Sequence, residues 1–382
     1  MTIIVAGTIG RSGLGGQAWA VLQYLLGLRA FGYDVYYLED CGISSWAYDW
    51  DKGEWTEDPE SPAAYVHSSL EPFGFGDRWA YRTNDRVLGM SLDELLAVCR
   101  RTDLLIVRGV PLWVWREEYD LPKRRAFIDV DPGFTQAAIL SGDKGVADGV
   151  AHCERRFTVG QCVGLNKCKI PQAGGPWLPT VPPVYLDEWP NQWPSERQGE
   201  PDFTSVIRWQ GFREQTFDGK VYGQRDKSFP KFFDMPSKLN AKFRIALLGT
   251  EPETLTRHGW EVVPGEVISK TPEAYREFIQ QSRAEFCVPK HGYVAMWSGW
   301  VSDRSICYLA SGRPVLMEET GISERLPTGL GIVTFKNLEE AVVLAREIQL
   351  QYDRHSRAAH ATAQTVFSTH NVLPHFLNAA MG

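Results

Sequence analysis

Two stretches of alternating strand and helix patterns, separated by a proline-rich segment, constrain the fold of this chain more than any other feature. The first stretch opens with the apolar run Thr2–Ala6, a glycine-rich loop, a helical pattern over 17–31 and a second strand over 34–38. The second restarts with a strand pattern over 204–209, after residues 171–201, which are rich in proline and show no period. Strands that alternate with helices form parallel sheets covered on both faces, so each stretch predicts a Rossmann-like domain.

The predicted domain boundaries follow from this pattern. We expect an N-terminal domain over residues 1–180, a linker over 181–202 and a C-terminal domain over 203–382. A length of 382 residues is more than one domain usually holds. The predicted class is therefore α/β, with two Rossmann-like domains facing each other across a cleft and a last helix that packs back on the N-terminal domain.

Charge and cysteine content indicate the compartment and exclude some partners. The net charge of −7 argues against general binding to nucleic acid or to an anionic membrane. No apolar run approaches the roughly 20 residues that span a bilayer, and the N-terminus reads as a strand rather than a signal peptide. The seven scattered cysteines are typical of reduced thiols. We expect a cytoplasmic protein without a membrane span.

Residues 290–315 combine the features of an anion-binding loop. A loop with glycines and serines leads into a helix that we expect to begin at Ser302 and to end before Gly312. Free backbone N–H groups and the positive end of a helix dipole favour phosphate at such a position. The cations Lys290 and Arg304 flank it. The stretch therefore predicts a site for the diphosphate of a nucleotide-sugar.

With both halves in view, two stretches resemble the glycosyltransferases of the GT-B fold. They are GLGGQAWAVLQYLLGLRAFGYDVYYLED near the N-terminus and SGWVSDRSICYLASGRPVLMEETG near the C-terminus. The pattern SGW-x-SDRS-x-CYLA-x-GRPV is most similar to a group of bacterial GT-B-like proteins whose chemistry is poorly defined. The resemblance implies a GT-B fold in which the N-terminal domain faces the acceptor and the C-terminal domain binds the donor.

The same resemblance implies a glycosyltransferase that takes its sugar from a nucleoside-diphosphate sugar, such as a UDP- or dTDP-sugar, without a metal or a resident cofactor. The acceptor is then a small molecule or a glycan, and a modified nucleic-acid base stays open. The cysteines and His152 have irregular spacing, which is not that of a metal site. The chain leaves open its oligomeric state and whether transfer inverts or retains configuration.

One departure from the family keeps other functions open. Many GT-B enzymes carry a glutamate in the donor helix that holds the ribose hydroxyls, where this chain has residues 305–308. The only acid nearby is Asp303, in the predicted first turn of the helix. A sugar-nucleotide epimerase on the same fold and a non-catalytic nucleotide- or sugar-binding protein are the two alternatives.

The predicted donor residues come from three parts of the chain. The four glycines of the loop over 7–16 exceed what a turn needs, although they could serve only a tight strand-to-helix turn. The family often takes a basic side chain from early in the second domain, for which Lys227 is our choice and a solvated basic loop the alternative. The predicted donor-binding residues are Gly15, Gly16, Lys227, Lys290, Ser298, Gly299, Trp300, Ser302, Asp303, Arg304 and Ser305.

Transfer also needs a group that takes the acceptor's proton. Asp129 and Asp131 follow a predicted strand, at the end where open α/β sheets bind ligands. His152 is a further candidate because histidine is a common general base, and the competing interpretations are a turn-forming Asp131 and a structural histidine. The acidic, aromatic segment over 41–60 is a lid, an acceptor-side loop or a solvated insertion. The predicted acceptor-binding residues are Gln17, Thr135, Gln136, Trp46 and Trp50.

Overall fold

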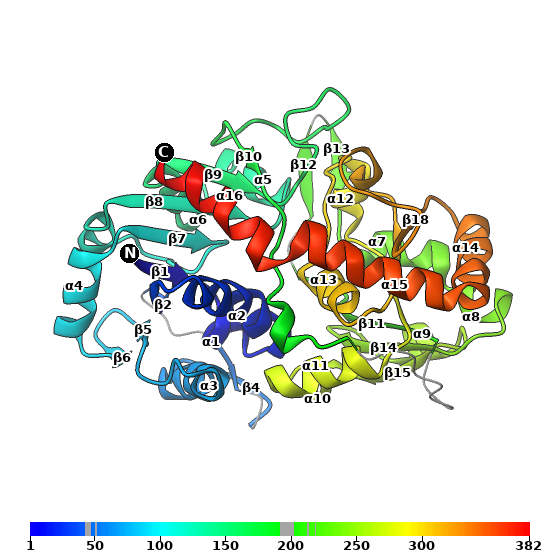
Figure 1. The fold of residues 1–382 in the computed structure, drawn as a ribbon, viewed down its shortest axis with the longest axis horizontal. Coiled ribbons are helices and arrows are strands. Elements are labelled where there is room, and N and C mark those ends of the chain that lie inside the picture. Colours follow the sequence, from blue (N-terminus) through cyan, green and yellow to red (C-terminus); the bar gives the residue numbers. More distant parts are fainter. Residues whose placement is uncertain (43–46, 50–51, 192–201, 212–213, 218) are drawn as a thin grey trace.

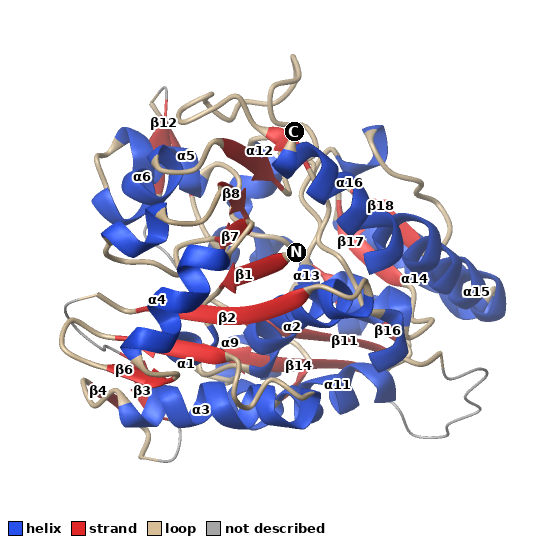
Figure 2. Ribbon diagram, turned by 60° about the vertical axis from the view of Figure 1, so that its left-hand side comes forward, coloured by secondary structure: helices blue, strands red, loops and turns tan. Residues whose placement is uncertain are grey.

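Two parallel sheets, one from each half of the chain, form the framework of the protein (Figures 1 and 2). The computed structural model describes residues 1–382 except 43–46, 50–51, 192–201, 212–213 and 218. Much of the predicted linker, together with Trp46 and Trp50, lies outside the described residues.

The N-terminal sheet has eight strands in the order β10-β9-β8-β7-β1-β2-β5-β6. Neighbouring strands are parallel except for β6, which is antiparallel to β5. In chain order the strands are β1 (Thr2–Ala6), β2 (Asp34–Asp40), β5 (Trp79–Arg82), β6 (Val87–Gly89), β7 (Leu104–Arg108), β8 (Arg124–Asp129), β9 (Arg155–Thr158) and β10 (Leu178–Pro179).

The C-terminal sheet has six strands, all parallel, in the order β15-β14-β11-β16-β17-β18. The strands are β11 (Phe203–Arg208), β14 (Phe243–Leu248), β15 (Glu261–Pro264), β16 (Ala284–Cys287), β17 (Val315–Glu318) and β18 (Ile332–Phe335). The strand order reverses between β11 and β16, and in the N-terminal sheet between β1 and β7. Ligands of open α/β sheets bind at the carboxyl ends of the strands at such a reversal.

Helices cover the sheets, and two small hairpins project from them. The helices are α1 (Ile9–Ser12), α2 (Gly15–Ala30), α3 (Glu60–Leu70), α4 (Leu92–Arg101), α5 (Phe134–Leu140), α6 (Lys144–Ala151), α7 (Arg225–Ser228), α8 (Met235–Lys238), α9 (Glu253–Thr256), α10 (Gly265–Ile268), α11 (Pro272–Gln281), α12 (His291–Ala295), α13 (Asp303–Ala310), α14 (Leu338–Leu350), α15 (Tyr352–Thr362) and α16 (Thr369–Met381). The hairpins are β3 (Ala47–Asp49) with β4 (Glu54–Thr56), and β12 (Gln215–Phe217) with β13 (Lys220–Tyr222).

Capping residues set the starts of several helices. Ser91 and Glu94 form a reciprocal capping box at α4, and the Thr271 hydroxyl accepts a hydrogen bond from a backbone N–H in the first turn of α11. Ser302 caps α13 in the same way. The helix expected over 17–31 begins two residues earlier, at Gly15.

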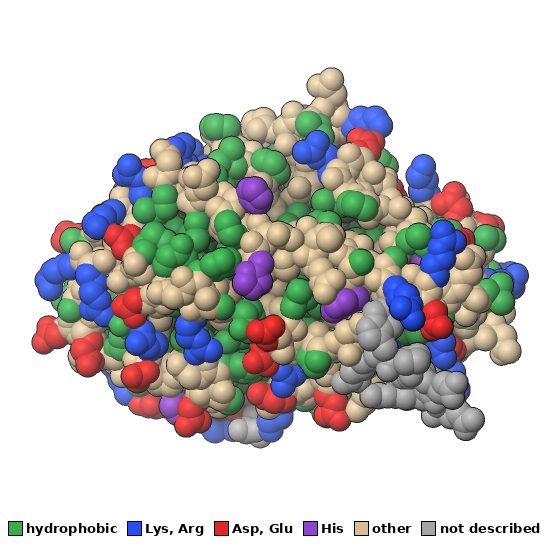
Figure 3. Space-filling view, viewed as in Figure 1, with side chains coloured by type: hydrophobic (Ala, Val, Ile, Leu, Met, Phe, Trp, Pro, Cys, Tyr) green, Lys and Arg blue, Asp and Glu red, His purple; other side chains and the backbone are tan. Residues whose placement is uncertain are grey.

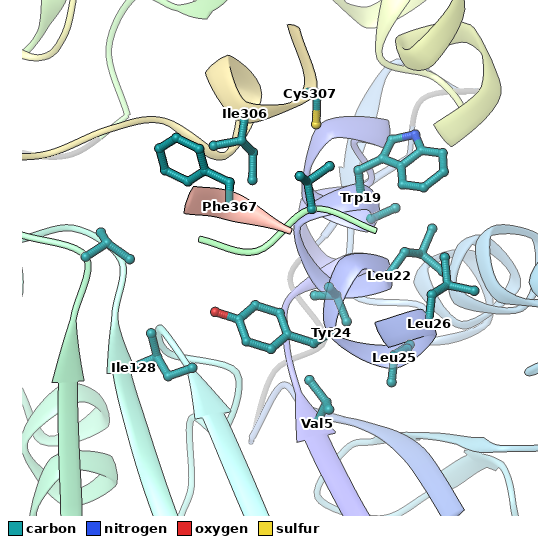
Figure 4. Packing of buried hydrophobic residues seen from close by; sticks show 14 of the residues in the cluster. Val5, Trp19, Leu22, Tyr24, Leu25, Leu26, Ile128, Ile306, Cys307 and Phe367 are labelled. Carbon is teal, nitrogen blue, oxygen red and sulfur yellow. The ribbon is translucent and has the colours of Figure 1, made fainter. Parts of the chain in front are cut away.

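Helix α2 lies between the two domains and carries much of their shared core. The Trp19 indole donates a 2.7 Å hydrogen bond to the Pro272 carbonyl, and the Gly15 N–H donates one of 2.6 Å to the Ser269 carbonyl. Figure 4 shows Trp19 and its helix beside Ile306 and Cys307 of α13. Burial of these apolar side chains therefore holds the domains against each other.

The chain crosses between the domains twice, and the two crossings pair. Val184 forms a parallel bridge with Ser368, and the Thr369 N–H donates to the Val184 carbonyl at 2.9 Å. After this junction α16 runs back over the N-terminal domain, against α2 and β8, whereas α15 covers the C-terminal domain (Figure 1). The last helix thus belongs to the N-terminal domain in space.

The surface mixes acidic and basic side chains. On the face in Figure 3 they are interspersed, without a continuous basic patch. Within the described residues, no helix is both long enough and apolar enough to cross a bilayer.

Candidate active site

Three cations gather at the carboxyl ends of β11 and β16, where the strand order of the C-terminal sheet reverses. Arg208 is the last residue of β11, and Lys290 follows β16 by three residues. Arg225 opens the short helix α7. Burial lowers the pKa of Lys290 and Asp131 opposes this shift, while the charges of Arg225 and Arg208 lower the pKa further, as expected for groups that lie near one another. Such a cluster is suited to an anion with several charged oxygens.

Arg225 is the most deeply placed of these cations. Its Nε donates to the Val288 carbonyl at 3.0 Å, and one terminal nitrogen donates to the Arg208 carbonyl at 3.1 Å. Burial lowers the pKa of Arg225 to about 10, so it remains a cation at neutral pH. In the described part of the chain neither Arg225 nor Arg208 forms an ion pair with a carboxylate. The cluster therefore retains positive charge for a ligand.

The N-terminal end of α13 is joined to the other domain by an ion pair. Arg108, the last residue of β7, is buried, and its guanidinium lies 2.7 Å from the Asp303 carboxylate in the first turn of α13. Burial opposes the charge of Arg108, but Asp303 raises its pKa above the ordinary value. Because Arg108 compensates Asp303, this carboxylate does not prevent an anion from binding near the helix end.

Asp131, from the N-terminal domain, contacts the cation cluster of the C-terminal domain through Lys290. Its carboxylate accepts a hydrogen bond from the Lys290 ammonium at 2.6 Å and another from the Tyr293 hydroxyl. Burial opposes its ionisation, yet Lys290 and the two hydrogen bonds hold the pKa of Asp131 below its usual value. Asp131 is therefore ionised at neutral pH and links the two carboxyl edges.

This ion pair predicts an acid-dependent contribution to stability. The pKa of Asp131 is lower in the folded chain than in the unfolded chain, so its contribution is present above about pH 4 and disappears as pH falls through the folded-state pKa. In urea unfolding, the difference in unfolding free energy between the wild type and Asp131→Asn is expected to shrink below about pH 4. A difference that stays constant from neutral to acidic pH would contradict the ion pair.

Asp129, which we predicted as a candidate base, is held by hydrogen bonds within the N-terminal domain, and this position favours a structural role. Its side chain is fully buried and accepts hydrogen bonds from Thr135 at 2.6 Å, Thr158 at 2.7 Å and Gln136 at 3.1 Å. Burial raises the pKa of Asp129. Thr135 and Gln136, expected at the acceptor, are therefore occupied in holding this carboxylate at the start of α5.

His152 lies at the opposite edge of the sheet from Asp131. It follows α6 just before β9 begins, its carbonyl accepts a hydrogen bond from Arg125 at the start of β8, and its ring lies 3.1 Å from Asp120 and stacks on Trp115. His152 is at the amino ends of the strands of the N-terminal sheet. The cation cluster is at the carboxyl edge of the C-terminal sheet, which faces the carboxyl ends of the N-terminal strands. The topology therefore separates His152 from the candidate site, and its role as a base stays a prediction that this position does not favour.

Part of the predicted donor loop joins the domains. The buried Ser298 hydroxyl donates to the Tyr293 carbonyl, and the Cys162 N–H of the N-terminal domain donates to the Ser298 carbonyl at 3.0 Å. Gly299 has a φ of +71°, and a Cβ there would lie 2.7 Å from the Cys162 nitrogen. Trp300 is buried and stacks on Tyr293 with centroids 4.5 Å apart. These residues position Tyr293 and α13 and are not open to a ligand.

Arg304 and Ser305 point into the C-terminal domain. The Arg304 guanidinium pairs with the fully buried Glu285 and donates to the Val206 carbonyl at 2.8 Å. Burial opposes the charge, but Glu285 raises the pKa of Arg304 above its ordinary value. The Ser305 hydroxyl is buried beside Cys287. Glu285 neutralises Arg304 within the C-terminal domain, and the charge of Arg304 is close enough to Arg225 to lower the pKa of Arg225. We assign Arg304 and Ser305 a structural role, and their contact with the donor stays a prediction.

The other predicted residues lie around the cluster rather than in it. A Cβ on Gly15 would be 2.2 Å from the Thr271 carbonyl oxygen, and one on Gly16 would be 3.0 Å from the Tyr275 ring, so both glycines serve the contact of α2 with α11. Gln17 lies half-buried in the same turn of α2. Lys227 pairs with Glu214 at 2.5 Å.

Four residues of the site were missed by sequence reasoning. Arg108 and Arg208 each end a buried strand, which is a signal that could have found them. Arg225 lies two residues before Lys227, within the basic stretch that was noted. Tyr293 carries no pattern in the sequence, because its role depends on Asp131 across the domain boundary.

The described residues contain no group of three or more His, Cys, Asp or Glu side chains arranged to hold a metal ion. The charged groups that the site offers are thus the three cations, Asp131 and the Arg108–Asp303 pair.

Solved structures with the same arrangement of domains identify the fold. An alpha-glucosyltransferase (AGT) in complex with UDP aligns over 100% of both chains with a TM-score of 0.62 and 13% identity. HepE of Anabaena, in complex with UDP and glucose, aligns over 99% of this chain and 98% of its own with a TM-score of 0.61 and 11% identity. The chain has the GT-B fold.

A third solved structure, AviGT4, described as a glycosyltransferase involved in avilamycin A biosynthesis, aligns over 100% of this chain and 97% of its own, with a TM-score of 0.54 and 12% identity. No protein-family model and no curated protein matches the sequence. At these identities the comparisons show the GT-B fold alone, and the activity must be argued from the residues of the site.

Proposed function

We propose that this chain transfers a glycosyl group from a nucleoside-diphosphate sugar to an acceptor hydroxyl. The observation that carries the proposal is the cluster of Arg208, Arg225 and Lys290 at the carboxyl ends of β11 and β16. Two of the three solved structures described above are complexes with UDP. The diphosphate of UDP or dTDP would lie against the cluster, near the N-terminus of α13.

The site suits departure of a diphosphate. In the transfer, the bond between the anomeric carbon and the β-phosphate oxygen breaks, and the acceptor oxygen forms a new bond to that carbon. Negative charge grows on the leaving diphosphate, where Arg208 and Arg225 stabilise it most strongly in the transition state. The acceptor hydroxyl releases its proton to solvent.

Asp131 is better suited to orienting groups than to accepting a proton from a hydroxyl. Its pKa is already lowered by Lys290 and Tyr293, and a weaker base contributes less to proton transfer. We assign it the role of holding Lys290 and of accepting a hydrogen bond from a reacting hydroxyl. The proposal needs no metal, because guanidinium and ammonium groups supply the positive charge.

Asp131→Asn tests this role. We expect kcat to fall about tenfold, less than for the loss of a strong general base, while the affinity for UDP changes little. Steady-state transfer and UDP titration of the same protein provide the measurement, with Asp120→Asn at the far edge of the sheet as the control. A fall in kcat of about ten-thousandfold would show instead that Asp131 is the base.

The function itself is tested by nucleotide binding and turnover. UDP or dTDP is expected to raise the melting temperature of the full chain, and a UDP- or dTDP-sugar with an acceptor is expected to release the diphosphate in the presence of EDTA. Epimerised sugar without any acceptor would favour an epimerase, and binding without turnover would favour a non-catalytic protein. If no nucleoside diphosphate stabilises the chain, the proposal is wrong.

A further inference from the structure

A second place in the molecule has the features of a ligand site. A cavity of about 630 Å³ lies between the domains, within the range of small-molecule sites. Its walls come from α1, the β3–β4 hairpin and α3 on one side, and from residues 270–273 at the start of α11 on the other. None of the three cations of the candidate active site lines it.

Hydroxyl groups and carboxylates dominate the cavity wall. The hydroxyls of Tyr65 and Ser69 are buried there and, apart from each other, have no hydrogen-bond partner within the described residues. Tyr48, Ser61 and Ser68 add further hydroxyl-bearing side chains. Two buried hydroxyls that have only each other as partners leave hydrogen-bonding capacity unused, and a ligand that hydrogen-bonds to them would use it.

The charge of the lining selects against anions. Its acidic side chains outnumber its lysines by four to two. Asp49 pairs with Lys52 at 3.3 Å and Glu60 pairs with Arg86 outside the lining, so Asp58 and Glu273 remain against Lys270. Asp58 and Glu273 have no ion-pair partner among the residues that the structure describes. A phosphate or a nucleic-acid backbone would be repelled here, whereas hydroxyl and ammonium groups would be accepted.

The position of the cavity relates it to the active site. α1 follows β1, and Asp131 follows β8, two strands away on the same carboxyl edge. Strands are spaced about 4.8 Å apart, so the two strand ends are about 10 Å apart. A molecule that fills the cavity and also reaches Asp131 is therefore longer than a single sugar ring.

We infer that this cavity binds the acceptor, and that the acceptor is a hydroxyl-rich molecule without negative charge, such as a neutral or amino-substituted oligosaccharide. The inference rests on the proposed function, because the ligand of the cavity is an acceptor only if the chain transfers a glycosyl group. The cavity and its selectivity do not depend on the identity of the donor.

Filling the cavity provides the test. Ala64 is exposed on α3 and lines the cavity, and His67, exposed one turn later, does not. Ala64→Trp is expected to weaken binding of maltotriose or kanamycin to the full chain by about tenfold or more, measured by calorimetry, whereas His67→Trp leaves it unchanged. Glu273→Lys is expected to weaken kanamycin more than maltotriose.

Anionic probes and UDP complete the experiment. Glucose 6-phosphate and a short single-stranded DNA are expected not to bind in the cavity. The inference is overturned if neither maltotriose nor kanamycin binds, if Ala64→Trp leaves their affinity unchanged, or if the anionic probes bind and lose affinity in Ala64→Trp. UDP titration in parallel separates the two proposals, because failure to bind UDP counts against the donor site alone.

Discussion

Arg208→Ala is expected to lower kcat/KM for transfer about 10²- to 10³-fold. Arg208 ends β11 as an exposed residue with no carboxylate partner among the described residues, so it makes no ion pair that the variant would lose. It is expected to contact the leaving diphosphate. Steady-state transfer from a UDP-sugar measures the effect, and the unfolding free energy should stay within about 0.5 kcal/mol of the wild type.

Arg244→Ala is the matched control for Arg208→Ala. Arg244 is near the amino end of the neighbouring strand β14 and pairs with Glu261 at 2.7 Å. Its removal takes one cation from the same sheet, but from the edge opposite the cation cluster. Transfer should be nearly unchanged. Equal losses of transfer in the two variants would mean that the net charge of the C-terminal domain, rather than the position of Arg208 in the cluster, supports the reaction.

Arg304→Ala is expected to destabilise the chain by about 3–5 kcal/mol. The variant leaves the fully buried Glu285 carboxylate without its cation and removes the hydrogen bond to the Val206 carbonyl. Urea unfolding followed by tryptophan fluorescence measures the loss. If Arg304 contacted the donor instead, the variant would bind UDP more weakly and its stability would be unchanged.

A double variant separates the buried pair from a ligand contact. Arg304→Met combined with Glu285→Leu removes both charges together, and most of the lost stability should return, because no charge is left buried alone. UDP affinity should return with it. If Arg304→Ala is as stable as the wild type but fails to bind UDP, Arg304 contacts the donor and our assignment is wrong.

The sequence predicts the framework because the framework depends on local patterns. Apolar runs such as Thr2–Ala6 and caps such as Ser91 and Thr271 act within a few residues, and the structure has these elements where the patterns place them. The resemblance to GT-B proteins then predicts how the two sheets are arranged, and the solved structures agree with the GT-B fold.

The site is predicted less well because its contacts join residues far apart in the chain. Arg304 and Gly15 fit donor-site patterns by position, yet one is neutralised by Glu285 and the other packs against Thr271. Lys290 lies in the cation cluster because β16 ends at the strand reversal, and its partner Asp131 comes from the other domain. No local pattern encodes such pairings.

A structure of the full chain with UDP bound tests the central claim most directly. We predict that the diphosphate lies within hydrogen-bonding distance of the Arg208 and Arg225 guanidiniums, beside the N-terminus of α13, and that the cavity at Tyr65 holds no nucleotide. A diphosphate bound elsewhere, or a UDP molecule in the cavity between α3 and α11, would contradict the account.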